Sequence, residues 1–222
     1  MPRIFRILPE EGIVHILTRG NNRQKVFRDS LDYKTYLDLL KAYKEEHRFL
    51  LYHYCLMLNH VHLVIEITSK TDLPRFMKQI NLAYLYHYKK RYSYCGHLWQ
   101  GRYKSLLISK DEYLITCGRY IELNPVKARI VNDPKDYKWS SYNVYAYGKK
   151  DGIVDYNPLY TDLGKTELKR RRDYREQIKN VMEKINLDVR FLGSEEFVAR
   201  MEKKFKVKNL KGARGRPKRL NK

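Results

Sequence analysis

Residues 58–66, LNHVHLVIE, determine how the middle of this chain folds. The apolar run is typical of a β-strand, in which successive side chains point to opposite faces of a sheet. His60 and His62 are two residues apart, so both imidazoles lie on one face and close together. The other face is apolar throughout and predicts packing beneath helices: Val61, Leu63 and Ile65.

Strands and helices alternate on both sides of this segment. Apolar residues at helical spacing predict helices, and apolar runs bounded by turn residues predict strands. The resulting order β-α-β-β-α-β is the split βαβ arrangement of an α+β, ferredoxin-like antiparallel sheet, with two helices on one face. We expect these elements in turn: a strand at 12–22, a helix at 29–47, strands at 48–58 and 60–67, a helix at 71–92, a strand within 96–109 and a helix at 111–124.

Two helix ends have recognisable residues. Thr71 is a plausible N-cap for the helix at 71–92, because its hydroxyl can accept a hydrogen bond from a free backbone amide. Pro125 is expected to stop the helix at 111–124, since proline lacks the amide hydrogen and restricts the residue before it.

The chain after residue 137 is expected to be less regular. The aromatic, turn-rich segment 138–159 should wrap the core, residues 166–185 form a basic helix, and Ser194 begins another helix that runs to about Phe205. We therefore divide the chain into four parts: a main folded domain at 1–145, a linker at 146–164, a helical basic extension at 165–206 and a basic tail at 207–222.

Charge is the strongest compositional signal. The 222 residues include 46 Lys and Arg against 25 Asp and Glu, a net charge of +21, which indicates affinity for a polyanion. No apolar run is long enough to span a membrane, and no apolar segment typical of a signal peptide opens the chain. The three cysteines form no C-x-x-C pair. We expect a reduced, cytoplasmic, nucleoid-associated protein without membrane partners.

About half of the excess charge lies at the C-terminal end. The stretch ARGRPKR at 213–219 resembles an AT-hook, in which Arg214 and Arg216 would enter a narrow A·T minor groove. The alternative is a basic tail that binds any nucleic acid through counterion release. In either case, deletion of 207–222 is expected to weaken binding and flatten its salt dependence.

The histidine pair has several interpretations. Two neutral imidazoles can bind one divalent cation or one phosphate, or they can simply be polar residues on an exposed sheet face. A histidine-triad nucleotide hydrolase needs a third alternate histidine, and Val64 stands at that position. Metal-assisted phosphodiester cleavage instead requires a separate hydroxyl nucleophile.

The helix at 111–124 offers that hydroxyl. Tyr120 and Asn124 are four residues apart and can point at one spot, so a phenol and an amide oxygen could serve together as nucleophile and metal ligand. The simpler interpretation is a surface aromatic followed by an ordinary helix end, because asparagine before proline commonly ends a helix.

Three motifs in order, NHVHLVIE, HLWQGRYKS and RYIELNPVKARIV, resemble the single-tyrosine HUH transposases, most closely the REP-associated branch of the IS200-like transposases. RGNN at 19–22 and WSSY at 139–142 fit as well, so the resemblance covers about residues 5–145. The hydrophobic residue that HUH enzymes have between the histidines is present as Val61.

This resemblance implies a function and its residues. His60, His62 and Asn124 would bind Mg²⁺ or Mn²⁺, and Tyr120 would be the nucleophile that forms a 5′-phosphotyrosine with single-stranded DNA beside a hairpin-forming palindromic repeat. The family includes dimers that exchange the tyrosine helix, but the short connection after residue 109 favours a monomer that uses its own helix.

Nearby cations and aromatics complete the predicted site. Arg19, Arg102 and Lys104 are candidates to bind DNA phosphates, and Trp99 either fills the core, which we favour, or stacks on a base. The alternative from another class is a non-catalytic DNA- or RNA-binding protein that retains the transposase fold, since such sheets also serve RNA binders.

Overall fold

The centre of the molecule is a five-stranded sheet in a computed structural model that describes residues 7, 9–179, 186–187 and 189–209. The strand order is β2-β3-β1-β4-β5. β1 pairs antiparallel with both β3 and β4, β2 pairs antiparallel with β3, and β5 pairs parallel with β4. The strand bounds are β1 Gly12–Arg19, β2 Leu50–Met57, β3 His60–Ile67, β4 Lys104–Ile108 and β5 Phe191–Leu192.

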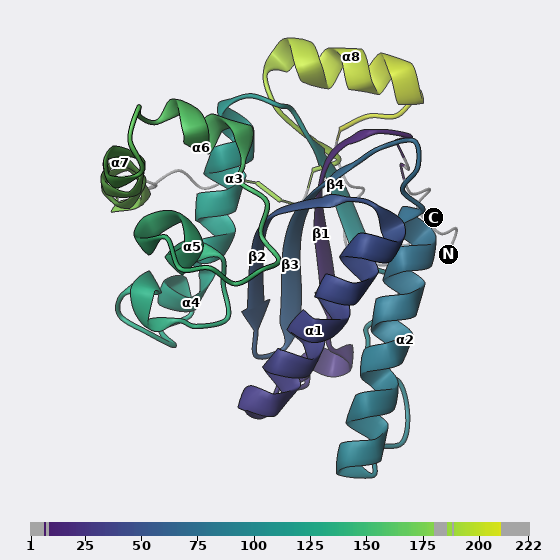
Figure 1. The fold of residues 1–222 in the computed structure, drawn as a ribbon. Helices are drawn as coiled ribbons and strands as arrows, with labels where there is room; N and C mark the ends of the chain where they lie inside the picture. The colour runs from purple at the N-terminus through teal and green to yellow at the C-terminus, as the bar shows by residue number, and fades with distance from the viewer. Residues whose placement is uncertain (1–6, 8, 180–185, 188, 210–222) are drawn as a thin grey trace, which may run out of the picture.

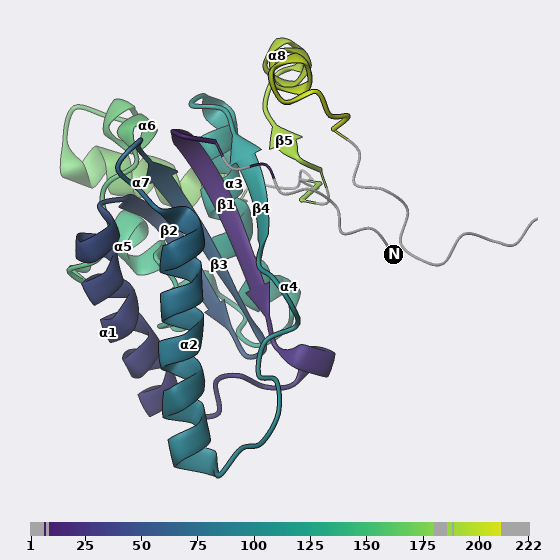
Figure 2. The same cartoon turned by 90° about the vertical axis from the view of Figure 1, so that its right-hand side faces the viewer.

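Helices α1 (Ser30–His47) and α2 (Leu73–Tyr92) cover one face of this sheet (Figures 1 and 2). The largest apolar cluster lies beneath them and includes the alternate residues of β3: Val61, Leu63 and Ile65. The α+β class, the order β-α-β-β-α-β and the placement of two helices over the apolar face of β3 agree with the sequence prediction.

The prediction of Thr71 as the N-cap of α2 is wrong. Asp72 is the cap, and its carboxylate accepts a hydrogen bond from the Arg75 amide at 3.0 Å. Thr71 instead fixes the preceding turn, because its hydroxyl accepts from the Thr68 amide and donates to the Arg48 carbonyl. Threonine and aspartate are both common helix N-caps, and in this structure the carboxylate of Asp72 makes the capping hydrogen bond.

Helix α3 (Glu112–Glu122) packs on the opposite face of the sheet, where it contacts β2 and β3. Asp111 caps it by accepting from the Tyr113 amide. The helix ends at Glu122, earlier than predicted, and Pro125 does not stop the chain there. Proline instead lies in the first turn of a second short helix, α4 (Asn124–Lys127), where its missing amide hydrogen has no consequence.

The segment after α4 packs against the domain. WSSY at 139–142 lines the edge of β2, with the Leu56 amide donating to the Trp139 carbonyl at 2.9 Å and the Ser141 amide to the Tyr54 carbonyl at 3.0 Å. This contact covers the edge strand, which would otherwise expose unpaired backbone groups. A 3-10 turn, η2 Pro134–Asp136, comes before WSSY in the chain, and α5 Tyr142–Tyr147 and α6 Pro158–Asp162 come after Ser141.

The segment 146–164, expected to be a linker, contains buried residues. Ile153 belongs to the cluster beneath α1 and α2, Asn157 is fully buried, and Tyr160 packs with α5 and α7 (Glu167–Lys179). The predicted helix at 166–185 is described as far as Lys179, and its remaining residues lie outside the described part of the chain.

The C-terminal extension adds to the sheet. β5 was not predicted, because a strand of two residues shows no alternation. Ser194 caps α8 (Glu195–Phe205) by accepting from the Phe197 amide, as expected. Figures 1 and 2 show α8 at the end of the sheet where β1 begins. Among the described residues, no helix has the length and apolar character needed to cross a membrane.

Candidate functional site

The two histidines lie at one end of the α3-side face of the sheet. His60 is opposite Arg19 across the β3–β1 pair. His62 is opposite Leu17, which is in turn opposite Lys104 on β4. Residues directly opposite one another in an antiparallel pair share a face. The register therefore brings two imidazoles, a guanidinium and an ammonium-bearing side chain to the same end of one face.

The histidine rings are held in fixed positions. Their centroids are 4.9 Å apart at an angle of 77°. The Nδ1 atom of His60 is 2.6 Å from Asn59 Oδ1, and the Nδ1 atom of His62 is 2.8 Å from Nε2 of a third histidine, His15. Both Nδ1 atoms are thus engaged by neighbours, and within the described part of the chain no hydrogen bond uses the Nε2 atom of either ring.

Burial favours the neutral form of both rings. It lowers the pKa of His60 to about 4, with a further contribution from the positive charge of Arg19. Burial also lowers the pKa of His62 well below its usual value, with contributions from His15, His60 and Arg19. A neutral imidazole retains a lone pair on one nitrogen, which is the state that binds a metal ion.

Sequence reasoning missed His15. It lies on β1, where it is buried with 3% of its surface exposed, and its ring stacks on that of His62 with centroids 5.1 Å apart. Alternation along β1 places His15 and Arg19 on one face, and this could be predicted from the sequence. The contact between His15 and His62 depends on the register between β1 and β3, and that register could not be predicted from the sequence.

Three motifs converge beside His60. The amide of Gly20 in RGNN donates to the Asn59 carbonyl at 2.8 Å, and the Gln100 amide of HLWQGRYKS donates to the Arg19 carbonyl at 2.7 Å. Only glycine fits at position 20, because a Cβ atom there would lie 2.5 Å from the Gln24 carbonyl oxygen. A short 3-10 turn, η1 Asn21–Arg23, completes this loop.

Trp99 belongs to the core side of this loop, as favoured from the sequence. Its ring packs near Tyr36 and Tyr84, and its Nε1 donates to the Asn81 carbonyl at 3.0 Å. A ring held in this way supports the loop from beneath.

Tyr120 comes from α3 to the same face of the sheet. It is half-buried and packs against an apolar cluster that includes Val64 of β3 and Met57 of β2. Met57 is the cross-strand neighbour of His60. Asn124 begins α4 and is also half-buried. The two residues therefore belong to successive helices joined at Leu123, rather than to one continuous helix as predicted.

A lysine lies against the candidate nucleophile. The Nζ atom of Lys127 is 3.7 Å from the centroid of the Tyr120 ring. Desolvation lowers the pKa of Lys127. A cation over an aromatic face is attracted to the ring, and it also lies near the phenolic oxygen whose negative charge would grow during attack.

The candidate phosphate-binding residues are distributed around this end. Arg19 is half-buried, and its Nε is buried without a hydrogen-bond partner among the described residues. Arg102 and Lys104 are exposed, in the loop before β4 and at its first residue. Arg214 and Arg216 lie outside the described residues.

The donor set determines which metal could bind. Among the described residues, no group of three or more His, Cys, Asp or Glu side chains is arranged to hold a metal ion. The two Nε2 atoms supply two nitrogen donors, and Asn124 could supply an amide oxygen. A site with two imidazoles and oxygen donors that leaves positions open suits a divalent cation that also binds phosphate. These residues fit such a cation.

The helix that carries Tyr120 is anchored by a buried polar network. Glu122 is fully buried, and its carboxylate accepts hydrogen bonds from Ser141 Oγ at 2.5 Å and Tyr174 OH at 2.6 Å. The carboxylate also lies 3.0 Å from Nδ1 of the buried His53 of β2, and His53 Nε2 is 3.2 Å from Asn157 Nδ2. These contacts connect α3 to β2, to WSSY and to α7.

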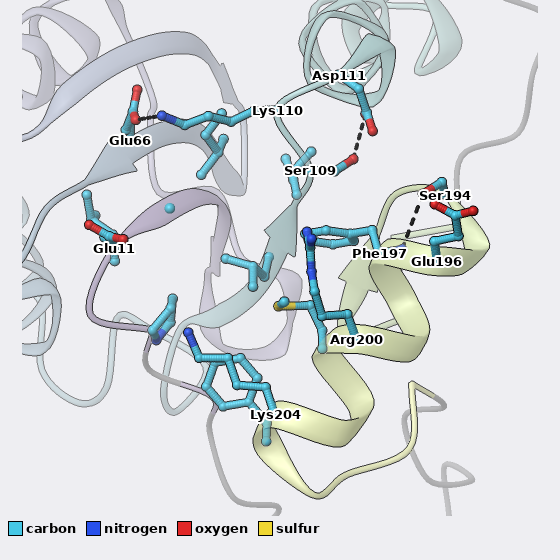
Figure 3. A pocket seen from close by; sticks show the side chains of 18 of the residues that line it. Glu11, Glu66, Ser109, Lys110, Asp111, Ser194, Glu196, Phe197, Arg200 and Lys204 are labelled. Atoms are coloured by element: carbon cyan, nitrogen blue, oxygen red, sulfur yellow. Dashed lines mark hydrogen bonds and ion pairs between the residues drawn. The ribbon is translucent and has the colours of Figure 1, made fainter.

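A cavity of about 630 Å³ lies at the opposite end of the sheet. Figure 3 shows Arg200 and Lys204 of α8 beside it, and Lys110 paired with Glu66 at its edge. Six residues of extended strand separate Glu66 from His60, about 20 Å. The cavity is therefore separate from the histidine pair.

The fold and the site together define a class of protein. It is an α+β protein with a mainly antiparallel sheet, and one face of the sheet has a histidine pair at one end and packs against the helix that carries Tyr120. Residues 10–124, just over half of the chain, match the family model described as Transposase IS200 like. The chain belongs to the IS200-like transposase family, as its motifs predicted. No curated protein matches the sequence.

Two solved structures are similar to this chain. One is a REP-associated tyrosine transposase bound to a REP hairpin, with 17% identity, a TM-score of 0.58, and coverage of 70% of this chain and 95% of that one. The other is a protein from Deinococcus radiodurans R1 described as a candidate transposase, with 20% identity, a TM-score of 0.39, and coverage of 55% and 95%. The first establishes a shared fold.

Proposed function

We propose that this transposase is a metal-dependent endonuclease and strand transferase that acts on single-stranded DNA beside a hairpin-forming repeat. The observation that carries the proposal is the placement of Tyr120 on the sheet face that bears His60 and His62. A family of transposases and a net charge of +21 support a DNA substrate. The shared fold with a REP-associated transposase bound to a REP hairpin supports the choice of hairpin repeats.

The reaction exchanges one phosphodiester for another. The phenolic oxygen of Tyr120 bonds to the scissile phosphorus, the phenol loses its proton, and the bond to the 3′ oxygen breaks as that oxygen takes up a proton. The products are a 5′-phosphotyrosine and a free 3′-OH. Attack by another 3′-OH reverses these steps and rejoins DNA without ATP.

The chain's own residues position the substrate and the charge. His60, His62 and Asn124 would hold Mg²⁺ or Mn²⁺, which supplies Lewis-acid polarisation of the scissile phosphate. Arg19, whose Nε is buried and unpartnered among the described residues, is suited to donate a hydrogen bond to a phosphate oxygen. Lys127 lies where it would favour the phenolate of Tyr120, and such help is needed because a free phenol has a pKa of about 10.

A denaturing protein gel tests the mechanism. Purified protein is incubated with Mn²⁺ and a single-stranded hairpin oligonucleotide labelled at either the 5′ or the 3′ end. We expect a covalent band that carries only the 3′-side label, and that is absent with EDTA or in Tyr120→Phe. Tyr113→Phe, which removes another hydroxyl from the same helix, should retain the band.

Two outcomes contradict the proposal. Cleavage without a covalent band would make water the nucleophile and Tyr120 a structural residue. Tight binding of hairpins without cleavage or linkage would favour the alternative of a non-catalytic DNA-binding protein.

A further inference from the structure

Each of the paired histidines makes one hydrogen bond through Nδ1, and each bond has a different partner. Asn59 meets His60, and His15 meets His62. In a neutral imidazole one nitrogen carries the hydrogen and the other has the lone pair, and the neighbour of one nitrogen decides which is which. These two contacts therefore bear on which nitrogen of each ring is available to a metal.

The tautomer of His60 follows from the surroundings of Asn59. The Nδ2 of Asn59 donates to the Arg23 carbonyl at 3.0 Å, and this bond fixes the orientation of the amide. The Oδ1 of Asn59 consequently faces His60, and an amide oxygen only accepts. His60 Nδ1 must then carry the hydrogen, and its Nε2 has the lone pair.

The tautomer of His62 depends on His15. A hydrogen bond between two imidazole nitrogens 2.8 Å apart requires that one donates and the other accepts. If His15 Nε2 accepts, His62 Nδ1 carries the hydrogen and His62 Nε2 has the lone pair, as in His60. His15 is buried and stacked on His62, so the ring has little freedom to turn away.

We propose that His15 and Asn59 are positioning residues that hold His62 and His60 as the tautomers whose Nε2 lone pairs face the cation site. This inference rests on the proposed function for the cation itself, but the tautomers are properties of the metal-free protein. Partners of this kind orient metal-binding histidines, and their loss commonly weakens metal affinity 10- to 100-fold.

Nitrogen NMR of the histidine side chains tests the tautomers directly. In the metal-free protein we expect both His60 and His62 to carry hydrogen on Nδ1. In His15→Phe, which keeps an aromatic ring but removes the acceptor, His62 should lose this preference while His60 retains it. In Asn59→Ala the pattern should be reversed. Hydrogen on Nε2 of either ring in the unaltered protein would overturn the proposal.

Calorimetric titration with Mn²⁺ alone supplies a second measurement. His15→Phe and Asn59→Ala should each bind Mn²⁺ about 10- to 100-fold more weakly. His15→Gln should bind within a few-fold of the unaltered protein, because the glutamine amide oxygen can occupy the position of the histidine Nε2. The matched control is His97→Phe, which removes an exposed histidine from a loop.

The outcomes separate the two proposals. If the unaltered protein binds no Mn²⁺ but has both Nδ1–H tautomers, the metal in the proposed function is wrong and the positioning role stands. If Mn²⁺ binds and His15→Phe and Asn59→Ala leave both tautomers and affinity unchanged, the positioning role is wrong. Should His15→Phe fail to fold, Asn59→Ala, on a partly exposed turn, and His15→Gln still decide the question.

Discussion

Lys127 lies within the third motif, RYIELNPVKARIV, and its position in the structure places it against Tyr120. Its Nζ is 3.7 Å from the centroid of the Tyr120 ring, a contact that leaves a positive charge beside the phenol. In the proposed reaction, negative charge would develop on the phenolic oxygen during attack, so the attraction should be stronger in the transition state than before it. Interactions that strengthen in this way increase the rate of the chemical step.

We therefore expect Lys127→Met to slow formation of the covalent adduct. A cation near an aromatic ring contributes about 0.5–2 kcal/mol, which corresponds to roughly 2- to 30-fold in rate. Single-turnover kinetics with saturating hairpin DNA would measure it. Lys138→Met removes an exposed lysine elsewhere and controls for lost DNA affinity. An adduct rate equal in the two variants would mean that Lys127 only packs on the ring.

The histidine pair could be predicted from sequence, but its partners could not. Strand alternation alone places His60 and His62 on one face. The contact of His62 with His15 requires the register between β1 and β3, and a shift of one residue would reverse which side chains meet. The contact of Lys127 with Tyr120 requires the bend between α3 and α4. The sequence instead predicted that the helix would end at Pro125.

At the scale of the element, α3 is held by a close packing contact as well as by Glu122. Gly118 lies against His53, and a Cβ atom at position 118 would be 2.4 Å from His53 Nε2. His53 cannot easily move, because it bonds Glu122 and Asn157 and its ring stacks on Tyr145 with centroids 4.5 Å apart.

Gly118→Ala should therefore destabilise the protein, although alanine normally favours a helix over glycine by about 1 kcal/mol. We expect a loss of about 1–3 kcal/mol in the free energy of unfolding, the usual effect of overpacking. A double-mutant cycle, measured by denaturant unfolding, tests whether the contact with His53 causes this loss. In a His53→Ala background, Gly118→Ala should be neutral or stabilising. An equal loss in both backgrounds would show that the contact with His53 is not responsible.

Helices α1 and α2 are joined by the buried carboxylate of Asp32. Burial alone would raise its pKa, but the hydrogen bonds from the Arg28 amide, His87, Tyr92 and Arg91 outweigh burial and lower the pKa below 3.8. The distances of these four contacts lie between 2.8 and 2.9 Å. The carboxylate of Asp32 can accept hydrogen bonds from all four donors. An asparagine amide at this position would point its own N–H groups at some of these donors, so those hydrogen bonds would be lost.

Asp32→Asn should lower the free energy of unfolding by about 3–5 kcal/mol at pH 7, the usual effect of breaking a buried ionic contact. Because the folded state has the lower pKa, the contribution of Asp32 is fully present above pH 3.8 and disappears as the pH falls through the folded value. The difference between the two proteins should thus shrink in acid. Asp38→Asn, on the exposed side of α1, is the control, and a pH-independent difference would contradict the argument.

The elements that sequence could not predict are the ones that tertiary contacts create. Long periodic segments such as α1 and α2 appear within a residue or two of the expected bounds. β5 has two residues and exists because it pairs with β4. The buried residues of 146–164 have no periodic pattern of their own. Tyr160 is buried against α5 and α7, and Ile153 joins the cluster beneath α1 and α2.

On the scale of the whole molecule, the question is whether α3 serves the sheet of its own chain. Only residues 109–111 connect β4 to α3, and Ser109 and Asp111 bond each other at 2.5 Å within this connection. In this structure Glu122 also connects α3 to His53 of β2 and to Tyr174 of α7 of the same chain, within a fully buried network.

We therefore expect the protein to act as a monomer of 26.9 kDa in which Tyr120 works with the histidines of the same chain. Mixing two inactive variants tests this: Tyr120→Phe retains the histidines, and the double variant His60→Ala, His62→Ala retains the tyrosine. If α3 serves its own sheet, the mixture forms no covalent adduct with hairpin DNA at any concentration, and light scattering gives the monomer mass. If helices are exchanged, the adduct returns on the chain that lacks the histidines, because only that chain carries Tyr120. Variants tagged to differ in size can be told apart on the gel. A label on the variant that lacks the histidines would show that its α3 works with the sheet of the other chain.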